Sequence, residues 1–400
     1  MIMVVASRRF ALILVTSLLV AFAVFAVGEV AIRLLVKPTI FGMALGPMEL
    51  APKDWDAGRA HLREVWEKGS GDLSYQVYDA QLGWNLGPNR RSADGLYLSS
   101  LEGIRAPRPD VSFGDLPPKR LIAVLGDSYA FGEKVRYEDA FPSQLEERLG
   151  PQYRVLNFGV PGYGVDQSYL RYLSDALSWK PEIVVLSFSW HNLLRTMTVY
   201  SFVSFSAFSI PLSKPRFLLA PAGLKQINVP TLAPEEILTK TRVSDLPFLE
   251  HTLGYYPLDW NETISYFPHI IRFIVPRFVH QLTPNQNGKK EAVFSVNEAI
   301  LRAFVQKAKE SGTTPIIVYL PGRSSLGESD ARRTLGREFL QASNLEHLDP
   351  TSCLLAVNPV ERFVPDDPHY APKGNAAVAK CIGPHIRDAL EQRASVAGES

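Results

Sequence analysis

A serine and a histidine, far apart in the sequence, have neighbours suited to acyl-transfer chemistry. Ser128 ends a Gly-Asp-Ser tripeptide directly after the apolar run of residues 121–125, and Asp366 precedes His369 by three residues. A serine hydroxyl becomes a nucleophile when an imidazole takes its proton, and a carboxylate fixes the tautomer of that imidazole. The pattern predicts Ser128 as nucleophile, His369 as base and Asp366 as its partner. Taken singly, each motif also fits a helix cap or a surface turn.

Two further polar segments follow apolar runs. Residues 157–164 read Asn-Phe-Gly-Val-Pro-Gly-Tyr-Gly, and glycines allow backbone N–H groups to approach a developing oxyanion closely. The alternative is a flexible turn; a nucleotide loop is excluded because the spacing is not G-x-G-x-x-G. Residues 189–192 read Ser-Trp-His-Asn, and the amide of Asn192 could donate another hydrogen bond there.

The elements that must position these residues follow an α/β rhythm. Short apolar runs predict strands, and the segments between them predict helices. Strands are expected at residues 121–125, 155–160, 183–188, 315–320 and near 348, and helices at 138–149, 165–179, 293–311, 329–342 and 374–393. Alternating strands and helices predict a parallel sheet covered on both faces. Active sites of such sheets lie at the carboxyl ends of the strands, where all four polar segments fall.

These segments, in this order, resemble the four sequence blocks of the SGNH/GDSL hydrolase family. The resemblance runs from about residue 121 to the final helix, and it implies a three-layer αβα sandwich with a flavodoxin-like five-stranded parallel sheet. It also implies ester or acyl chemistry by Ser128, His369 and Asp366, without metal or cofactor. The N–H groups of Ser128 and Gly162 and one Asn side chain would form the oxyanion hole.

The third block departs from the family pattern, which has Asn followed by Asp. Counting without gaps places His191 at the Asn position, whereas a shift of one residue restores Asn192. A neutral amide is a donor at any pH, so Asn192 is favoured, with His191 as the alternative. A classical α/β-hydrolase fits poorly, because Ala130 replaces the second glycine of G-x-S-x-G.

The expected function is an extracytoplasmic serine esterase or deacylase acting on O-acyl groups of a glycan or on a small ester. The glycan rests on the resemblance to membrane-anchored members. One alternative is an O-acyltransferase with the same triad, because water and a sugar hydroxyl can both take the acyl group. Another is a catalytically retired glycan-binding module. The charges, 42 Lys plus Arg against 41 Asp plus Glu, give no basic excess for nucleic acid.

The N-terminus predicts a membrane segment. Arg8 and Arg9 precede an uncharged run over residues 10–28, which is long enough to span a bilayer. Basic residues before the run favour a cytoplasmic N-terminus, so the rest would lie on the periplasmic side of the inner membrane. The alternative is a cleaved signal peptide ending at the Ala-Phe-Ala of residues 21–23.

The expected domain organisation has a mid-chain insertion. Residues 1–37 form the anchor, 38–119 a linker and irregular lead-in, 120–393 the hydrolase domain, and 195–288 an insertion within it. The aromatic-rich insertion is interpreted as a cap over the site or as a packed subdomain. Its basic cluster at residues 214–217 is interpreted as a solvated face or as a contact for an anionic polymer. Cys353 and Cys381 could form a disulfide or remain free buried thiols.

Overall fold

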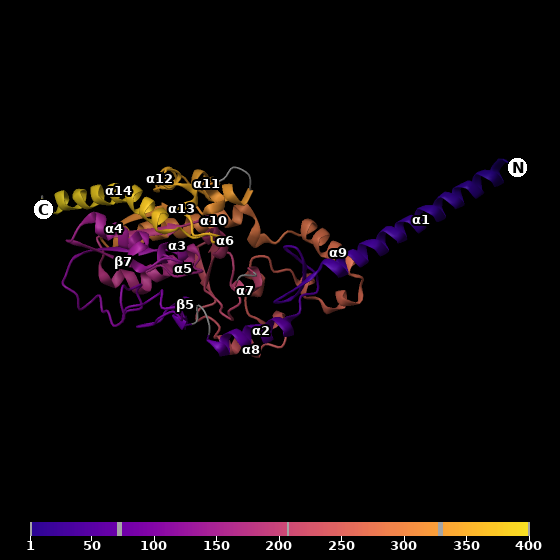
Figure 1. Cartoon of the computed structure of the whole chain (residues 1–400), viewed down its shortest axis with the longest axis horizontal. Coiled ribbons are helices and arrows are strands. Elements are labelled where there is room, and N and C mark those ends of the chain that lie inside the picture. Colours follow the sequence, from indigo (N-terminus) through magenta and orange to yellow (C-terminus); the bar gives the residue numbers. More distant parts are fainter. Residues whose placement is uncertain (1, 70–73, 206–207, 327–330, 399–400) are drawn as a thin grey trace.

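A four-stranded parallel sheet lies in the part of the molecule farthest from the N-terminal helix (Figure 1). The computed structural model describes residues 2–69, 74–205, 208–326 and 331–398. The strands, in spatial order, are β7 (Tyr153–Asn157), β6 (Arg120–Leu125), β8 (Ile183–Phe188) and β11 (Thr314–Tyr319). The α/β fold is as expected, but the fifth strand is reduced to one parallel bridge between Leu348 and Val318. The chain turns there through Asp349 and Pro350 into a helix, which leaves no room for a strand.

Helices cover both faces of the sheet and give three layers. Alternate residues of each strand point to opposite faces of the sheet, so the apolar residues of one strand contribute to two hydrophobic cores. Leu125 and Leu186 pack with one set of helices, and Val124 and Val185 pack with the other. The first set is α5 (Val165–Arg171), α10 (Lys290–Glu310) and α11 (Ala331–Ser343); the second is α4 (Phe141–Leu149), α12 (Thr351–Leu355) and α14 (Pro372–Gly398).

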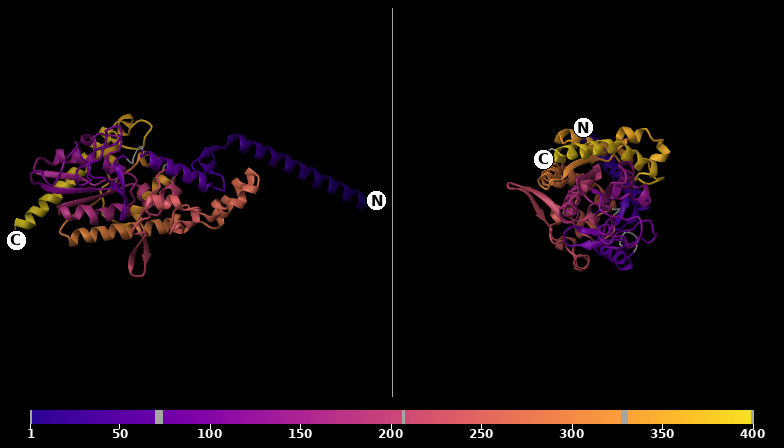
Figure 2. Two further views of the ribbon diagram at one scale, coloured as in Figure 1. Left: turned by 90° about the horizontal axis from the view of Figure 1, so that it is seen from below. Right: turned by 90° about the vertical axis from the view of Figure 1, so that its left-hand side faces the viewer.

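The lead-in and the insertion pack together between the sheet and the N-terminal helix (Figures 1 and 2). They share one aromatic cluster, in which Phe41 and Trp55 of the lead-in contact Phe202 and Trp260 of the insertion. Their strands are only two to five residues long, which explains their weak periodicity in the sequence. The lead-in holds β1 (Lys37–Thr39), β2 (Gly42–Leu45), β3 (Met48–Glu49), α2 (Trp55–Lys68), β4 (Gln76–Asp79) and β5 (Gly83–Leu86). The insertion holds α7 (Ser201–Ser204), β9 (Arg216–Ala220), β10 (Gly223–Ile227), α8 (Pro234–Thr239) and α9 (His269–Leu282), and α6 (Trp190–Arg195) of the α/β core ends where the insertion begins.

The basic cluster of the insertion is buried, so neither the solvated face nor the polymer contact is correct. Lys214 is fully buried and forms an ion pair with Asp166 at the start of α5. Its ammonium also donates to the carbonyls of Thr198 and Pro215. Burial raises the pKa of Asp166 and lowers that of Lys214, because both charged forms lose their hydration. The pair ties the insertion to the α/β core.

A long apolar helix, α1 (Ile2–Leu35), projects from the body (Figure 1). Within its segment Phe10–Leu35, the most apolar window of 18 residues has a mean hydropathy of 2.8 and is not buried. Within the described part of the chain, it is the one helix with the length and composition to cross a membrane.

Cys353 and Cys381 form a disulfide, with Cα atoms 5.9 Å apart, inside the range this bond requires. The bond connects α12 to α14, and the loop with His369 lies between these helices in the sequence.

Candidate functional site

Ser128 is the first residue of a short helix at the carboxyl end of β6. The turn into this helix, α3 (Ser128–Phe131), requires glycine at position 126, whose φ is +153°. A Cβ there would lie 2.4 Å from the hydroxyl of Ser187 on the neighbouring strand. Asp127 caps the helix by accepting the N–H of Tyr129, so the capping role coexists with the functional one. This turn places the Ser128 side chain at the open edge of the sheet.

His369 reaches the same edge from the loop before α14. Its Nε2 lies 2.8 Å from Oγ of Ser128, a hydrogen-bond distance that suits proton transfer. The opposite ring nitrogen, Nδ1, lies 2.6 Å from Oδ1 of Asp367. A hydrogen bond from Nδ1 to this carboxylate leaves Nε2 free to accept the serine proton. The structure thus brings together the predicted nucleophile and base, 241 positions apart in the sequence.

The carboxylate in contact with His369 belongs to Asp367, so the prediction of Asp366 is wrong. Asp366 adopts a left-handed backbone conformation, φ 56°, and is exposed. Asp367 also accepts the backbone N–H of His369, in a tight turn that Pro368 favours. Burial acts to raise the pKa of Asp367, but two hydrogen bonds from His369, together with electrostatic attraction to His369 and Lys134, lower it overall. Because two adjacent aspartates precede Pro-His, the sequence alone does not show which of them contacts the histidine.

The glycine block forms a tight turn beside Ser128. Gly162 has φ +85° and lines the cavity that contains Ser128 and His369. No carbonyl of the described residues accepts its N–H group. At position 159, a Cβ would lie 2.3 Å from the backbone nitrogen of Phe131, so glycine there lets the block approach α3. This placement suits an oxyanion hole formed by the N–H groups of Ser128 and Gly162.

Neither side chain expected as the third donor lines this cavity. Asn192 is fully buried; its amide donates to the carbonyl of Tyr163 and accepts the N–H of Ser189. It therefore fixes the turn next to Gly162 instead of facing a substrate. His191 stacks on Trp190 with ring centres 3.6 Å apart. The assignment of Asn192, and the alternative of His191, are both corrected by this packing.

Two charged side chains that sequence reasoning missed lie in the cavity. Arg195 donates to Oδ2 of Asp127 at 2.9 Å, and its guanidinium lies over the ring of Phe208. Glu133 approaches Nε2 of His369 to 3.6 Å. Neither belongs to an apolar run or a recognisable motif, so no pattern pointed to them.

The cavity has a volume of about 460 Å³ and is lined by residues from three parts of the chain. The core supplies Ser128, Gly162 and His369; the lead-in supplies Trp84; the insertion supplies Phe208 and Leu212. Tyr200, Phe202, Tyr255 and Trp260 of the insertion pack in a cluster shared with the lead-in, whereas Tyr266, Phe267 and Phe278 are exposed. The insertion therefore packs against the lead-in and contributes one wall of the cavity.

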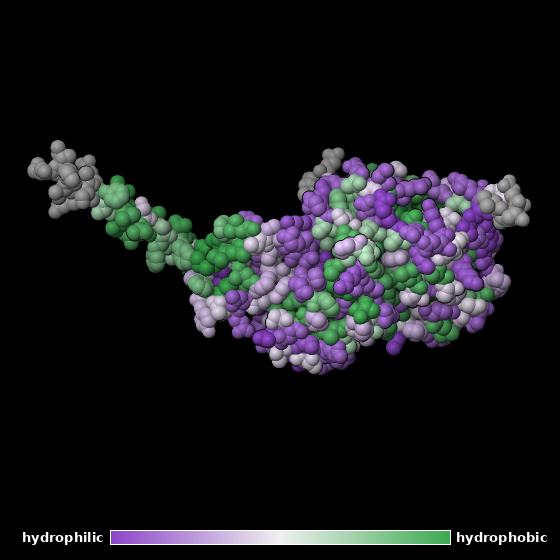
Figure 3. All heavy atoms as spheres, turned by 180° about the vertical axis from the view of Figure 1, so that it is seen from behind, coloured by the Kyte–Doolittle hydropathy of each residue, from purple (hydrophilic) through white to green (hydrophobic). Residues whose placement is uncertain are grey.

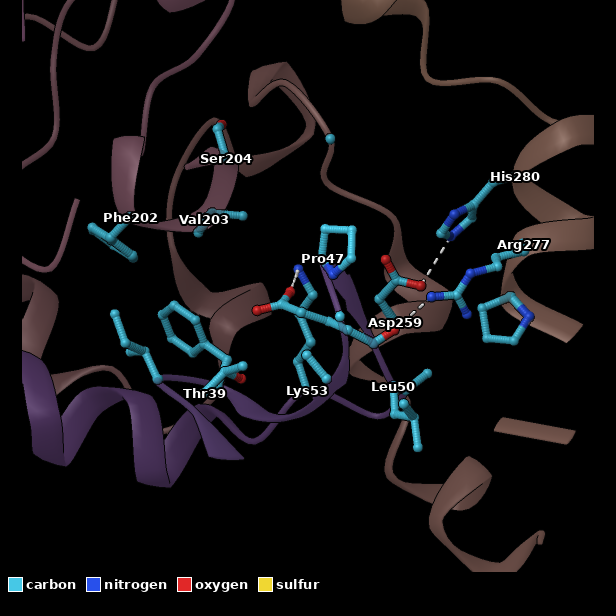
Figure 4. A pocket seen from close by; sticks show the side chains of 18 residues that line it. Thr39, Pro47, Leu50, Lys53, Phe202, Val203, Ser204, Asp259, Arg277 and His280 are labelled. Atoms are coloured by element: carbon cyan, nitrogen blue, oxygen red, sulfur yellow. Dashed lines mark hydrogen bonds and ion pairs between the residues drawn. The ribbon is translucent and has the colours of Figure 1, made fainter. Parts of the chain in front are cut away.

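A second cavity, of about 400 Å³, lies between the lead-in and α9 (Figure 4). Its polar side chains contact protein groups: Lys53 pairs with Glu49, His280 lies 2.9 Å from Asp259, and Arg277 donates to the carbonyl of Glu49. Its serine, Ser204, donates to the carbonyl of Leu253 and has no imidazole partner among the described residues. Of these two cavities, the one at Ser128 therefore has the arrangement of side chains that acyl chemistry requires.

No protein-family model and no curated protein sequence matches the chain. Solved structures do match. One is the lipase/acylhydrolase from Enterococcus faecalis, at 13% identity and a TM-score of 0.35, covering 67% of this chain and 96% of that one. Another is a GDSL-like lipase from Bacteroides thetaiotaomicron, at 11% identity and a TM-score of 0.34, covering 68% and 89%. At these values the function must be argued from the site itself.

Proposed function

We propose that this chain is a serine esterase of the SGNH type that removes O-acyl groups from a glycan. The observation that carries the proposal is the continuous chain of hydrogen-bond contacts from Ser128 through His369 to Asp367 at the edge of a cavity. Such a chain lets a neutral imidazole take the serine proton and stabilises the imidazolium that results.

The geometry supports a two-step reaction. Oγ of Ser128 attacks the ester carbonyl while its proton passes to Nε2 of His369, and the carbonyl oxygen becomes an oxyanion near Gly162. The carbon–oxygen bond to the alcohol then breaks, and the imidazolium returns the proton to the leaving oxygen. Water then attacks the acyl-enzyme and gives a proton to His369. The bond between the acyl carbon and Oγ of Ser128 breaks, the imidazolium returns the proton to this oxygen, and the acid is released. A sugar hydroxyl in place of water would produce acyl transfer by the same intermediate.

Support for a small acyl group on a sugar comes from the size and lining of the cavity. A volume of about 460 Å³ is in the range of sites for small molecules. Leu212 and Phe208 offer apolar contacts for an acyl chain, while Arg195 and Glu133 offer hydrogen bonds to hydroxyl groups.

We further propose that α1 anchors the chain in the inner membrane, with the catalytic domain on the periplasmic side. Support comes from the basic residues Arg8 and Arg9 before the apolar segment. The disulfide between Cys353 and Cys381 also suits an oxidising compartment.

Labelling with a fluorophosphonate probe tests the esterase proposal directly. The full-length chain in detergent should react covalently at Ser128 and hydrolyse p-nitrophenyl acetate. The Ser128→Ala variant should lose the label and about a thousandfold or more of the rate. Ser201→Ala is the matched control, because Ser201 lines the same cavity without a histidine contact among the described residues. Equal labelling of the native chain and Ser128→Ala would refute the mechanism.

A further inference from the structure

The helix α9 carries its apolar residues on the outside. Ile274, Val275, Phe278 and Leu282 recur at the spacing of one helical face, and they are 41–66% exposed. The segment 266–267 just before the helix adds two exposed aromatic residues, Tyr and Phe. A helix on a water-facing surface shows the opposite arrangement.

Two arginines and a histidine of α9 contact the body and hold the helix on it. Arg272 donates to the carbonyl of Ala51, and Arg277 donates to the carbonyl of Glu49. His280 lies 2.9 Å from Asp259, and Figure 4 shows both beside Arg277 at the second cavity. Because its charged groups contact protein, the helix is fixed in an orientation that presents the apolar face to the surroundings.

The N-terminus of α9 is attached to α1. The carboxylate of Glu29 accepts the backbone N–H of Ile270 and lies 3.2 Å from Nδ1 of His269. A Cβ at position 28 would lie 3.0 Å from the side chain of Ile270, so glycine there allows close packing. The two helices therefore lie side by side where α1 meets the body (Figure 1).

This junction coincides with the end of the membrane-spanning stretch. The uncharged run of residues 10–28 spans about 28 Å as a helix, close to the thickness of a bilayer's hydrocarbon core. The polar–apolar boundary of the membrane would then lie near Glu29, level with the start of α9. The apolar surface of α1 continues onto the body at this junction (Figure 3).

We infer that α9 is a second membrane contact, which inserts its apolar face at the boundary between lipid headgroups and acyl chains. The inference rests on the proposed anchoring by α1, whose apolar surface the helix extends. Amphipathic helices bind membranes in this way, and exposed aromatic residues favour the interfacial region. Two contacts, one across the bilayer and one along its surface, orient the catalytic domain relative to the membrane.

Site-directed fluorescence in lipid vesicles tests the inference. The native cysteines are joined in a disulfide, so a single introduced cysteine can be labelled selectively with an environment-sensitive dye. Full-length Phe278→Cys and Leu282→Cys would be reconstituted in phosphatidylethanolamine–phosphatidylglycerol vesicles with nitroxide-labelled lipids as quenchers. Lys309→Cys, an exposed position on α10, is the control, and Leu19→Cys reports the anchor.

The expected result is quenching by lipid at both α9 positions at least about twofold stronger than at Lys309→Cys. Equal, weak quenching at the α9 positions and at Lys309→Cys would overturn the inference. Shielding of the α9 positions from both lipid and aqueous iodide would also overturn it, because a second copy of the chain or another protein would then cover the helix. Weak quenching at Leu19→Cys would contradict the anchor alone, since the α9 labels are compared with Lys309→Cys independently.

Discussion

The α/β core and the insertion satisfy their buried backbone groups in different ways. In the core, strands such as β8 bond to neighbours along their whole length. In the insertion, polar side chains form hydrogen bonds to several buried backbone carbonyls. Lys214 donates to two carbonyls, Arg216 donates to the carbonyl of Met197, and Asn228 donates to that of Lys214. In an irregular segment, hydrogen bonds from side chains can satisfy the buried backbone groups that a sheet satisfies through hydrogen bonds between its strands.

The core supplies Ser128, His369 and Asp367, whereas the insertion and the lead-in supply walls of the cavity. The largest effect should therefore come from the catalytic loop of the core. Asp367→Asn should lower kcat for p-nitrophenyl acetate by a factor of about 10² to 10⁴, because the amide no longer holds the correct imidazole tautomer. Asp366→Asn, the matched control, should stay within about twofold. Steady-state kinetics of both variants decide between the two carboxylates; a larger loss at Asp366 would contradict the observed pairing.

The next largest effect is expected at the buried ion pair between the insertion and the α/β core. Lys214→Met leaves the carboxylate of Asp166 buried without a cation, and we expect a loss of about 3–5 kcal/mol in the free energy of unfolding. Urea denaturation measures it, with Lys225→Met on the exposed hairpin as control. Adding Asp166→Asn should restore part of the loss. Equal stability of Lys214→Met and the control would mean that the insertion does not depend on its buried pair.

A somewhat smaller effect is expected from the disulfide in the core. Replacing Cys353 and Cys381 by alanine frees a segment of 28 residues in the unfolded chain. The loop-entropy model gives a cost of about 3 kcal/mol. Thermal denaturation of the double variant, beside the native chain with and without reductant, measures this cost. A reduced native chain as stable as the oxidised one would contradict it.

The smallest effect concerns the boundary between the regions, where His191 follows β8. Burial, then Arg195 and His369, lower the pKa of His191 to about 3. Between pH 6.5 and 3 the unfolded chain binds a proton here that the folded chain does not, so stability falls as the pH falls. The free energy of unfolding should therefore decrease between pH 6.5 and pH 5, and His191→Gln should make this decrease smaller by up to about 2 kcal/mol.

Urea titrations at the two pH values test this, with the exposed His385→Gln as control. An unchanged pH dependence in His191→Gln would show that His191 is protonated in the folded chain.

The core could be predicted from the sequence because its strands are continuous apolar runs. Strand β8 begins and ends where its apolar run does. Strand β7 ends at Asn157, earlier than expected, because Val160 is buried in the glycine turn and reads like a strand residue. Apolar periodicity reports burial and only indirectly hydrogen bonding.

The site could be predicted in part, because roles set by residue type are easier to infer than roles set by orientation. Ser128 and His369 could be assigned because a hydroxyl and an imidazole are the groups that acyl-transfer chemistry requires. Asp366 and Asp367 are the same residue type, and they differ in backbone conformation and in their contacts with His369. The amide of Asn192 could donate to an oxyanion or, as observed, to a backbone carbonyl. The insertion, with no periodic pattern, depends on individual side-chain hydrogen bonds that no local pattern encodes.

The disulfide has a consequence for the timing of enzyme maturation. A thiol pair stays reduced in a cytosol buffered by glutathione and oxidises only after transfer to a compartment with a thiol oxidase. At the periplasmic location proposed above, the bond around the segment with Asp367 and His369 would therefore close after export. Cells lacking that oxidase would then hold the exported chain with its two thiols reduced. A smaller share of the exported molecules would have this segment ordered, so redox supply would limit the amount of working enzyme.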